Sequence, residues 1–274
     1  MREFPIYVPL DGDHIAAVVT VPEERPRGMV ALLQGLGSGR SHRYQLWTRA
    51  AHELADRGIA SVRMDYREMG DSTGLISGTL NDPPVEEILE VIRVGLRALD
   101  LPTCAVVGNC MGGRAALRVA QELGDCEAVG VIVTDNPQNY VGRAREAAMH
   151  ASKAKRLARK IERRITRGRR HHERHEHIPI QWIPEIPATL GVHPMLLMYV
   201  GPERFARPLQ VDATALIRST KTPATMISFQ TIVADTLHLD FPIEVQAELL
   251  DRVVRWLDDE VPWRVSVGER KQTA

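Results

Sequence analysis

The chain has 274 residues, 44% of them hydrophobic, and its 35 basic and 35 acidic side chains give no net charge. This composition is ordinary for a globular protein, and the length allows a sizeable buried core. No apolar run is long enough to span a bilayer, and the first residues lack the features of a signal peptide. Three cysteines are too few for a disulfide framework and favour a reducing compartment, so we expect a cytoplasmic protein.

The predicted elements begin with two extended segments joined by the turn LDGD, after which apolar strands alternate with amphipathic helices. We expect strands at residues 4–9, 14–22, 29–34, 59–65, 104–108, 128–134, 194–201 and 224–233. We expect helices at residues 43–58, 83–100, 111–124, 213–221 and 244–260. Strands that alternate with crossover helices predict an α/β fold with a mostly parallel central sheet flanked by helices.

A basic segment interrupts this alternation after the sixth strand. Residues 141–177 contain 13 Lys or Arg and 4 Asp or Glu, which leaves 22 and 31 in the rest of the chain. The apolar residues of the segment repeat at helical spacing opposite a densely basic face: Leu157, Ile161 and Ile165. We therefore predict a helical cap, or lid, at residues 137–192, inserted into a core formed by residues 1–136 and 193–274.

The stretch GNCMGG, residues 108–113, joins a predicted strand to a predicted helix. Gly-x-nucleophile-x-Gly in this setting is the pattern of the α/β-hydrolase nucleophile elbow, which normally carries serine. Cys110 occupies the nucleophile position, while Gly108 and Gly112 supply the small residues that a sharp turn requires. Because a helix N-terminus favours a thiolate, we interpret Cys110 as a nucleophile. The two other cysteines are interpreted as buried structural residues: Cys104 and Cys126.

An acyl-transfer nucleophile needs a base and an acid that orients the base, and in this fold the histidine comes last in the chain. His238 follows the last predicted strand and is the expected base. The acid is expected at Glu203, after the seventh strand, with Asp135, after the sixth, as the alternative. More distant options are Asp212 and Asp235.

The oxyanion hole is expected from two main-chain N–H groups. One belongs to Met111, directly after the nucleophile, and the other to Leu36 in the Gly-rich loop QGLGSGRSH after the third strand. The glycine spacing of that loop matches neither a dinucleotide fingerprint nor a P-loop, and we expect no cofactor.

Residues 37–74, GSGRSHRYQLWTRAAHELADRGIASVRMDYREMGDSTG, resemble the α/β hydrolases associated with exosortase systems and, more broadly, the serine-aminopeptidase-like hydrolases. The match is most specific in MDYREMGDSTG, where Glu68 replaces the usual glycine. The exosortase-associated group also has a cysteine-centred elbow. Its segment after the seventh strand is similar to VGPERFARP, and this similarity places Glu203 at the acidic position.

The resemblance covers most of residues 30–135, with thinner patches near 195–205 and 235–257, and it leaves out the basic segment. This sequence differs from the family pattern directly after Cys110, where Met111 stands in place of an acidic residue. The resemblance therefore implies an α/β-hydrolase fold, while the substrate class stays open.

A cysteine nucleophile indicates thioester chemistry. The thioester acyl-enzyme exchanges with other thiols at little thermodynamic cost and reacts readily with amines. We therefore expect an enzyme that acts on an acyl thioester or ester, as a thioesterase or hydrolase or as an acyltransferase. The alternative is a non-catalytic binding protein on a hydrolase scaffold.

The basic face of the predicted cap is expected to recruit an anionic acyl carrier, either CoA or an acidic acyl carrier protein. The residues expected to bind the carrier are Arg156, Lys160, Arg163, Arg164 and Arg167. Two other roles are disfavoured. The segment lacks the interleaved aromatic residues of a nucleic-acid-binding surface. His171 and His175 have the spacing of a possible zinc site. We favour instead the interpretation that they form a solvated basic face together with His172 and His177.

Overall fold

The computed structural model describes six parts of the chain: residues 1–35, 37–75, 82–134, 193–203, 222–234 and 242–264. The chain divides into two units, one of residues 1–134 and 183–274 and the other of residues 135–182. The second unit lies outside the described residues, as do the predicted cap at 137–192 and the predicted helix at 213–221. The cap therefore stays a prediction.

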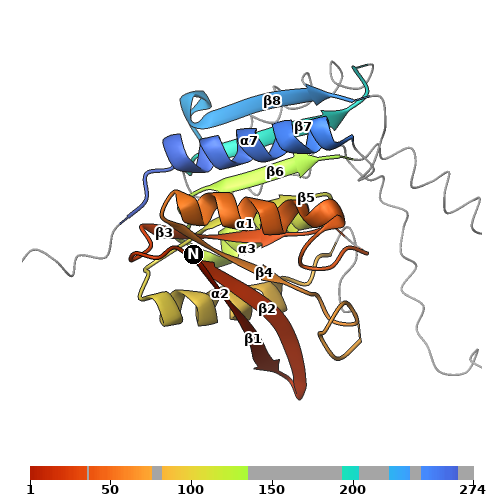
Figure 1. Ribbon diagram of the computed structural model, residues 1–274, viewed down its shortest axis with the longest axis vertical. Coiled ribbons are helices and arrows are strands. Elements are labelled where there is room, and N and C mark those ends of the chain that lie inside the picture. Colours follow the sequence, from red (N-terminus) through yellow and green to blue (C-terminus); the bar gives the residue numbers. More distant parts are fainter. Residues whose placement is uncertain (36, 76–81, 135–192, 204–221, 235–241, 265–274) are drawn as a thin grey trace, which may run out of the picture. The chain divides into compact units, whose positions relative to one another are not determined.

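An eight-stranded sheet lies at the centre of the described fold, in the spatial order β1-β2-β4-β3-β5-β6-β7-β8 (Figure 1). Its strands are β1 Arg2–Leu10, β2 Asp13–Val21, β3 Gly28–Leu33, β4 Ile59–Met64, β5 Ala105–Asn109, β6 Val129–Val133, β7 Met195–Gly201 and β8 Ile227–Val233. The pairs β1–β2 and β2–β4 are antiparallel and all the others are parallel. The mostly parallel sheet predicted from the sequence is confirmed.

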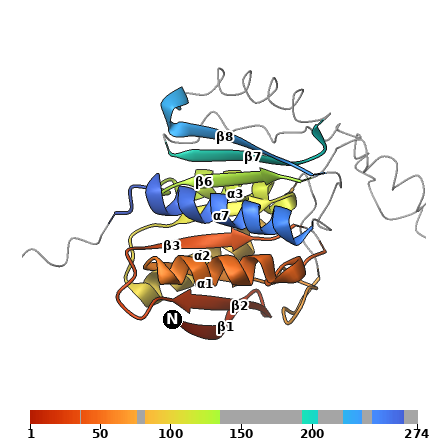
Figure 2. The same ribbon diagram turned by 45° about the horizontal axis from the view of Figure 1, so that its top comes forward.

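Helices cover both faces of this sheet. They are α1 Leu46–Asp56, α2 Val85–Leu99, α3 Met111–Leu123 and α7 Ile243–Asp259. Figures 1 and 2 show α1 and α7 on one face and α2 and α3 on the other. Because both faces are covered, β3, β4 and β5 are buried at every position, which explains why most of their residues are apolar.

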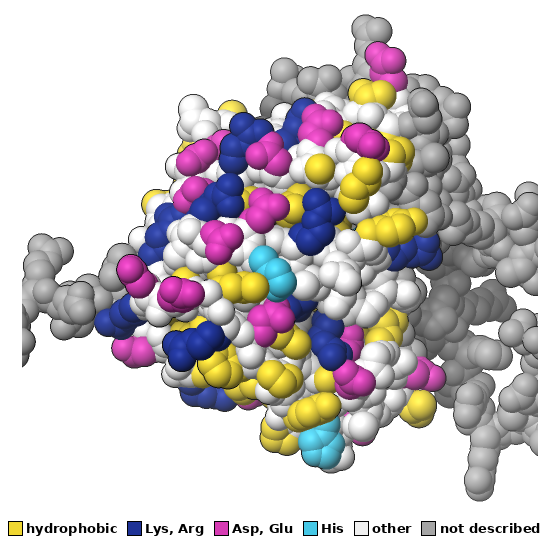
Figure 3. All heavy atoms as spheres, in the orientation of Figure 1, with side chains coloured by type: hydrophobic (Ala, Val, Ile, Leu, Met, Phe, Trp, Pro, Cys, Tyr) yellow, Lys and Arg dark blue, Asp and Glu magenta, His cyan; other side chains and the backbone are white. Residues whose placement is uncertain are grey.

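The α7 helix shows how the apolar pattern builds the core. Leu250, Val253, Val254 and Leu257 recur at spacings of three and four residues and are buried in one cluster with Trp47 of α1. The opposite side of α7 carries ion pairs such as Arg252–Glu248 and Arg255–Asp251. Figure 3 shows Lys or Arg and Asp or Glu side chains interspersed over this side of the molecule. None of the helices in the described ranges is long and apolar enough to cross a membrane.

Two elements start three residues later than the sequence-based prediction, and the other described boundaries differ from it by at most two residues. The helix expected at 43–58 starts at Leu46, because Arg43–Gln45 form a 3₁₀ turn in which Tyr44 has a positive φ of 54°. The strand expected at 224–233 starts at Ile227, after another 3₁₀ turn at Ala224–Met226. In both cases a tight turn replaces the first residues of the expected element.

The hairpin of β1 and β2 forms as the turn LDGD predicts. Asp11 and Gly12 have φ values of 54° and 85°, the pair of positive angles that suits a two-residue hairpin turn. β1 contains two prolines within its paired length, Pro5 opposite Val18 and Pro9 opposite His14.

The motif MDYREMGDSTG contains a strained residue. Glu68 is exposed and has a φ of 62°, a left-handed conformation that glycine adopts at no steric cost. Glu68→Gly is therefore expected to raise the free energy of unfolding by about 1 kcal/mol, measured by urea denaturation. Glu68→Ala, which keeps the Cβ atom but removes the carboxylate, is the control. Equal stabilities of the two variants would contradict this explanation.

Candidate active site

Cys110 occupies a sharp turn between β5 and α3. Its backbone angles, φ 54° and ψ −121°, lie outside the regions that an L-residue normally adopts. Its N–H donates to the carbonyl of Ile132 at 3.0 Å, which fixes the turn against β6. Residues in such strained conformations cluster at active sites, where the surrounding structure holds them. The predicted strand–turn–helix setting of Cys110 is confirmed, and its side chain is partly exposed.

The glycines of the elbow are required by close main-chain contacts. A Cβ atom on Gly108 would lie 2.3 Å from the carbonyl carbon of Gly112. A Cβ atom on Gly112 would lie 2.3 Å from the carbonyl oxygen of Leu33 at the end of β3. These distances are far below any tolerated contact, so α3 can approach the ends of β3 and β5 only through glycine.

The loop after β3 passes directly beside Cys110. A Cβ atom on Gly35 would lie 3.1 Å from Cys110 Cβ and 3.6 Å from Cys110 Sγ. Met111, on the other side of Cys110, begins α3 and is buried. Leu36 lies outside the described residues, so the oxyanion hole stays a prediction.

The carboxylate of Asp65 anchors this loop. Asp65 is buried and accepts a bond from the N–H of Arg40 at 2.6 Å, together with an ion pair from the Arg40 guanidinium. It also accepts from the N–H of Asp71 at 3.2 Å, while Arg40 bonds the Asp71 carboxylate. A Cβ atom on Gly70 would collide with the Asp65 carboxylate. The motif MDYREMGDSTG thus holds the loop beside Cys110.

A second set of bonds fixes the beginning of the same loop. The Tyr66 hydroxyl donates to the carbonyl of Gln34 at 2.9 Å, and Gln34 Nε2 donates to the carbonyl of Met64 at 2.6 Å. Burial raises the pKa of Tyr66, so its hydroxyl keeps its hydrogen and remains a donor.

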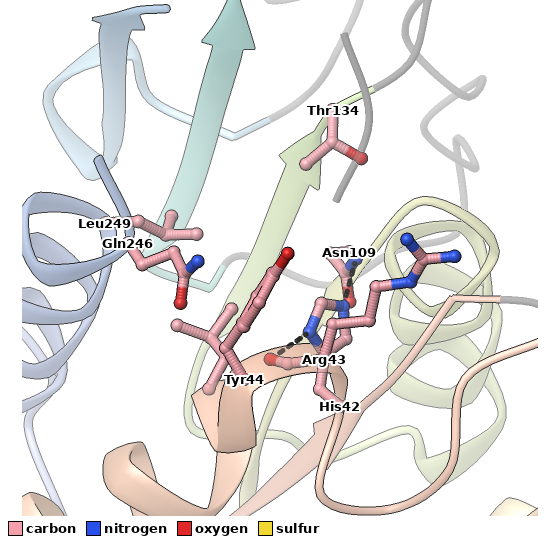
Figure 4. Close-up of a pocket in the computed structure, with 8 residues that line it drawn as sticks. His42, Arg43, Tyr44, Asn109, Thr134, Gln246 and Leu249 are labelled. Atoms are coloured by element: carbon pink, nitrogen blue, oxygen red, sulfur yellow. Dashed lines mark hydrogen bonds between the residues drawn. The ribbon is translucent and has the colours of Figure 1, made fainter. Parts of the chain in front are cut away.

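The end of the loop contacts the elbow through a histidine. His42 Nε2 lies 3.1 Å from Asn109 Nδ2, and Asn109 directly precedes Cys110. Both side chains line a small pocket at the carboxyl end of the sheet (Figure 4). The pocket is lined by His42, Arg43, Tyr44, Leu46, Asn109, Thr134, Gln246 and Leu249. Its volume of about 10 Å³ suits one water molecule rather than an acyl group.

A family model described as the alpha/beta hydrolase fold matches residues 29–174, slightly more than half of the chain. The chain belongs to the α/β-hydrolase fold family. The sharp turn between β5 and α3 is the strand-to-helix elbow of this fold.

Solved structures of other α/β hydrolases share the fold of this α/β hydrolase. An esterase from Pyrococcus furiosus is 15% identical with a TM-score of 0.62, and the match covers 93% of this chain and 90% of that one. A dienelactone hydrolase from Anabaena variabilis is 14% identical with a TM-score of 0.56, covering 93% and 96%. A thermophilic esterase from Thermogutta terrifontis is 18% identical with a TM-score of 0.55, covering 94% and 98%. A search of the curated proteins finds no significant match.

The remaining predicted site residues of this α/β hydrolase are only partly described. Glu203 is exposed and lies just beyond the end of β7 at Gly201. Several predicted residues lie outside the described ranges: His238, Asp135, Asp212, Asp235, Arg156, Lys160, Arg163, Arg164 and Arg167. The histidine cluster at 171–177 also lies outside them. The triad, the carrier-binding face and the link to exosortase systems stay predictions.

Sequence reasoning missed His42, Asn109 and Asp65, which hold the loop against the elbow. The available signals were the SHR and DYR stretches of the family resemblance and the position of Asn109 directly before Cys110. None of these signals identifies a partner, because His42 and Asn109 are 67 residues apart in the sequence.

The two other cysteines behave as the sequence predicts. Cys104 and Cys126 are buried, and the Cys126 thiol lies 3.1 Å from the carbonyl oxygen of Cys104. Burial raises the pKa of Cys104 well above its ordinary value and that of Cys126 to about 12. Both thiols are therefore protonated and unreactive at neutral pH.

Proposed function

We propose that this α/β hydrolase acts on acyl thioesters or esters through an acyl-enzyme formed on Cys110. The observation that carries the proposal is the strained conformation of Cys110 between β5 and α3, with Gly35 of the neighbouring loop against it. The turn is strained and is possible only because glycines stand where a Cβ atom would clash. Strain of this kind lowers the free energy of unfolding and is typical of functional sites, which supports a catalytic role for Cys110.

In the proposed reaction, His238 takes the proton of the Cys110 thiol while Sγ attacks the carbonyl carbon of the substrate, which forms a tetrahedral intermediate. The N–H groups of Met111 and Leu36 stabilise its oxyanion. Collapse of the intermediate breaks the bond to the leaving thiol or alcohol, which takes a proton from His238, and leaves an acyl thioester on Cys110. Attack by water, an amine or an alcohol, with His238 accepting its proton, releases the acyl group on that acceptor. His238 then returns the proton to the departing sulfur, which restores the Cys110 thiol.

Thioester substrates fit a thiol nucleophile better than oxyesters do. Transfer from a thioester to Cys110 exchanges one thioester for another, so the acyl-enzyme forms at little thermodynamic cost. Attack on an oxyester instead makes a less stable product and depends more on protonation of the leaving alcohol. We therefore infer that acyl thioesters acylate the enzyme faster than oxyesters of the same acyl group.

The test is intact-mass spectrometry after rapid mixing with a short-chain acyl thioester. An increase equal to one acyl group, mapped by peptide digestion to Cys110, would support the proposal. A non-catalytic binding protein on the same scaffold would show no adduct at any time or substrate concentration, and that result would overturn the proposal. The wild-type protein alkylated at Cys110 beforehand is the control for adducts at other residues.

The base and the acid are tested by three substitutions in the same acylation assay. His238→Ala is expected to lower the acylation rate almost as far as loss of the nucleophile, because nucleophile and base act as one unit. Glu203→Gln is expected to lower it substantially, and Asp135→Asn is the matched control. If Asp135→Asn is crippling while Glu203→Gln is silent, the acid is Asp135.

The basic segment is proposed to bind the carrier of the acyl group. The triple change of Arg163, Arg164 and Arg167 to Glu is expected to raise the apparent KM for an acyl group carried by CoA or an acidic carrier protein, most strongly at low salt. Turnover of a small free thioester should be nearly unchanged. Equal losses with both substrates would show that these residues act on the fold rather than on the carrier.

A further inference from the structure

The segment that ends the loop after β3 is held in an unfavourable backbone conformation. His42, Tyr44 and Gln45 have φ values of 60°, 54° and 57°, although none of them is glycine. Left-handed angles of this kind cost roughly 1 kcal/mol each and persist only where other contacts enforce them. The contacts that hold His42 are therefore informative about what this segment does.

Both the main chain and the ring of His42 are held by contacts. Its main-chain N–H donates to the carbonyl of Gly39 at 2.8 Å, and its ring packs edge-on against Trp47 with centroids 5.9 Å apart. Figure 4 shows the ring between the carbonyl of Arg43 and the carboxamide of Asn109. His42 is only 9% exposed, so these bonds form away from solvent.

The bonding pattern assigns one tautomer to this ring. Nδ1 lies 3.4 Å from the carbonyl oxygen of Arg43, which can only accept, so Nδ1 carries the hydrogen. Burial lowers the pKa of His42 to about 4, which keeps the imidazole neutral at neutral pH. Nε2 is then an acceptor, and Asn109 Nδ2 donates to it at 3.1 Å.

Asn109 is the link to the nucleophile. Its side chain is 1% exposed, and its Oδ1 atom has no hydrogen-bond partner among the described residues. The bond from Nδ2 to His42 therefore orients this carboxamide within the described structure. Because Asn109 directly precedes Cys110, the bond of its side chain to His42 restrains the backbone of the elbow.

We propose that His42 and Asn109 form a positioning pair, which holds the Gly-rich loop at the distance from the elbow that acylation of Cys110 requires. The inference rests on the proposed function for its catalytic consequence. Asp65 and Tyr66, directly after β4, bond the loop on one side. The positioning pair bonds the loop to the elbow on the other. The pair thereby sets the relation between the sulfur and the N–H groups that would receive the oxyanion.

The experiment is a double-mutant cycle with His42→Leu, Asn109→Leu and the double variant, in full-length protein. His42→Gln, which can still accept a bond from Asn109, tests for rescue. His52→Leu, the same replacement at a surface-accessible histidine of α1, is the matched control. The acylation rate and apparent KM are measured with a short-chain acyl thioester, and urea unfolding checks that each variant is folded. If Asn109→Leu does not fold, Asn109→Ser replaces it in the cycle.

Each single leucine variant is expected to acylate at least about tenfold more slowly with little change in apparent KM, and the double variant no more slowly than the worse single variant. His42→Gln should recover most of the rate, and His52→Leu should match the wild type. Multiplicative effects in the double variant, or a failure of His42→Gln to recover any rate, would overturn the positioning pair.

A second readout separates this inference from the proposed function. The rate of Cys110 alkylation by iodoacetamide, followed across pH, depends on how the elbow presents the sulfur but requires no acyl transfer. If the wild type forms no acyl adduct, the proposed function fails. A non-additive change of alkylation rate, about threefold or more, across the same cycle would still support the positioning pair. Unchanged alkylation and acylation in all variants would overturn it.

Discussion

Replacement of Cys110 by alanine is expected to abolish the acyl adduct and to lower turnover by at least about 10⁴-fold, while the protein stays folded. The substitution removes only the sulfur and its hydrogen. Because the Cys110 side chain is partly exposed, little core packing is lost. Intact-mass spectrometry measures the adduct, and urea denaturation measures the free energy of unfolding. Turnover at the wild-type rate in Cys110→Ala would remove Cys110 from the mechanism.

Two further substitutions at the same position separate chemistry from strain. Cys110→Ser is expected to retain little activity, because a hydroxyl is far less acidic than a thiol. Cys110→Gly is expected to be inactive but about 1 kcal/mol more stable than Cys110→Ala, because glycine adopts a φ of 54° without steric cost. Equal stabilities of the Gly and Ala variants would show that the elbow is not strained.

The second large effect is expected at Gly112, where alanine should lower the free energy of unfolding by at least about 3 kcal/mol or prevent folding. The added Cβ atom would meet the carbonyl oxygen of Leu33 at 2.3 Å. The position of the Cβ atom is fixed by the backbone and the oxygen belongs to the main chain, so no rotation of a side chain can relieve the contact. Urea denaturation of the purified variant, or its yield of soluble protein, measures the loss.

Gly124→Ala is the matched control for this prediction. Gly124 ends the same helix, α3, with a φ of 68° and nothing within 4 Å of an added Cβ atom. Its replacement should cost only about 1 kcal/mol, the backbone term alone. If Gly112→Ala costs no more than Gly124→Ala, α3 can move away from β3 and the elbow is less constrained than the contacts imply.

The parts of the fold that depend on local pattern could be predicted from the sequence. Continuous apolar runs identified the buried strands, and the glycines around Cys110 identified the elbow, because each signal lies within a few residues of the structure it specifies. The 3₁₀ turn at Arg43–Gln45 could not be predicted in this way. Its positive φ angles at Tyr44 and Gln45 interrupt a segment whose apolar pattern is helical, and His42 and Trp47 on either side of it are in ring contact.

The supports of the candidate site could not be predicted because they join distant segments. Asp65 bonds Arg40 across 25 residues, and His42 bonds Asn109 across 67. An aspartate after a strand or a histidine in a loop has many possible partners, and the sequence does not say which one the fold brings close. Cys110 was found because its signal is local. The expected base, His238, was inferred from chain order, and the expected acid, Glu203, from chain order and the family resemblance.

The two prolines of β1 have a consequence for how this protein meets other molecules. His14 and Ala16 of β2 accept main-chain bonds at their carbonyls from Thr73 and Asp65, so their backbone groups face away from β1. Their partners in β1 therefore direct their own backbone groups outward, at the end of the described sheet.

Successive residues of a strand direct their N–H and C=O groups to opposite sides. The residues of β1 whose backbone groups point away from β2 are therefore Glu3, Pro5, Tyr7 and Pro9. Two of these four residues have no N–H to offer. A strand from another molecule would find every second donor missing, and it could form only part of the hydrogen-bond ladder. This edge is thereby protected against sheet-to-sheet aggregation at high protein concentration, although Tyr7 is 62% exposed there.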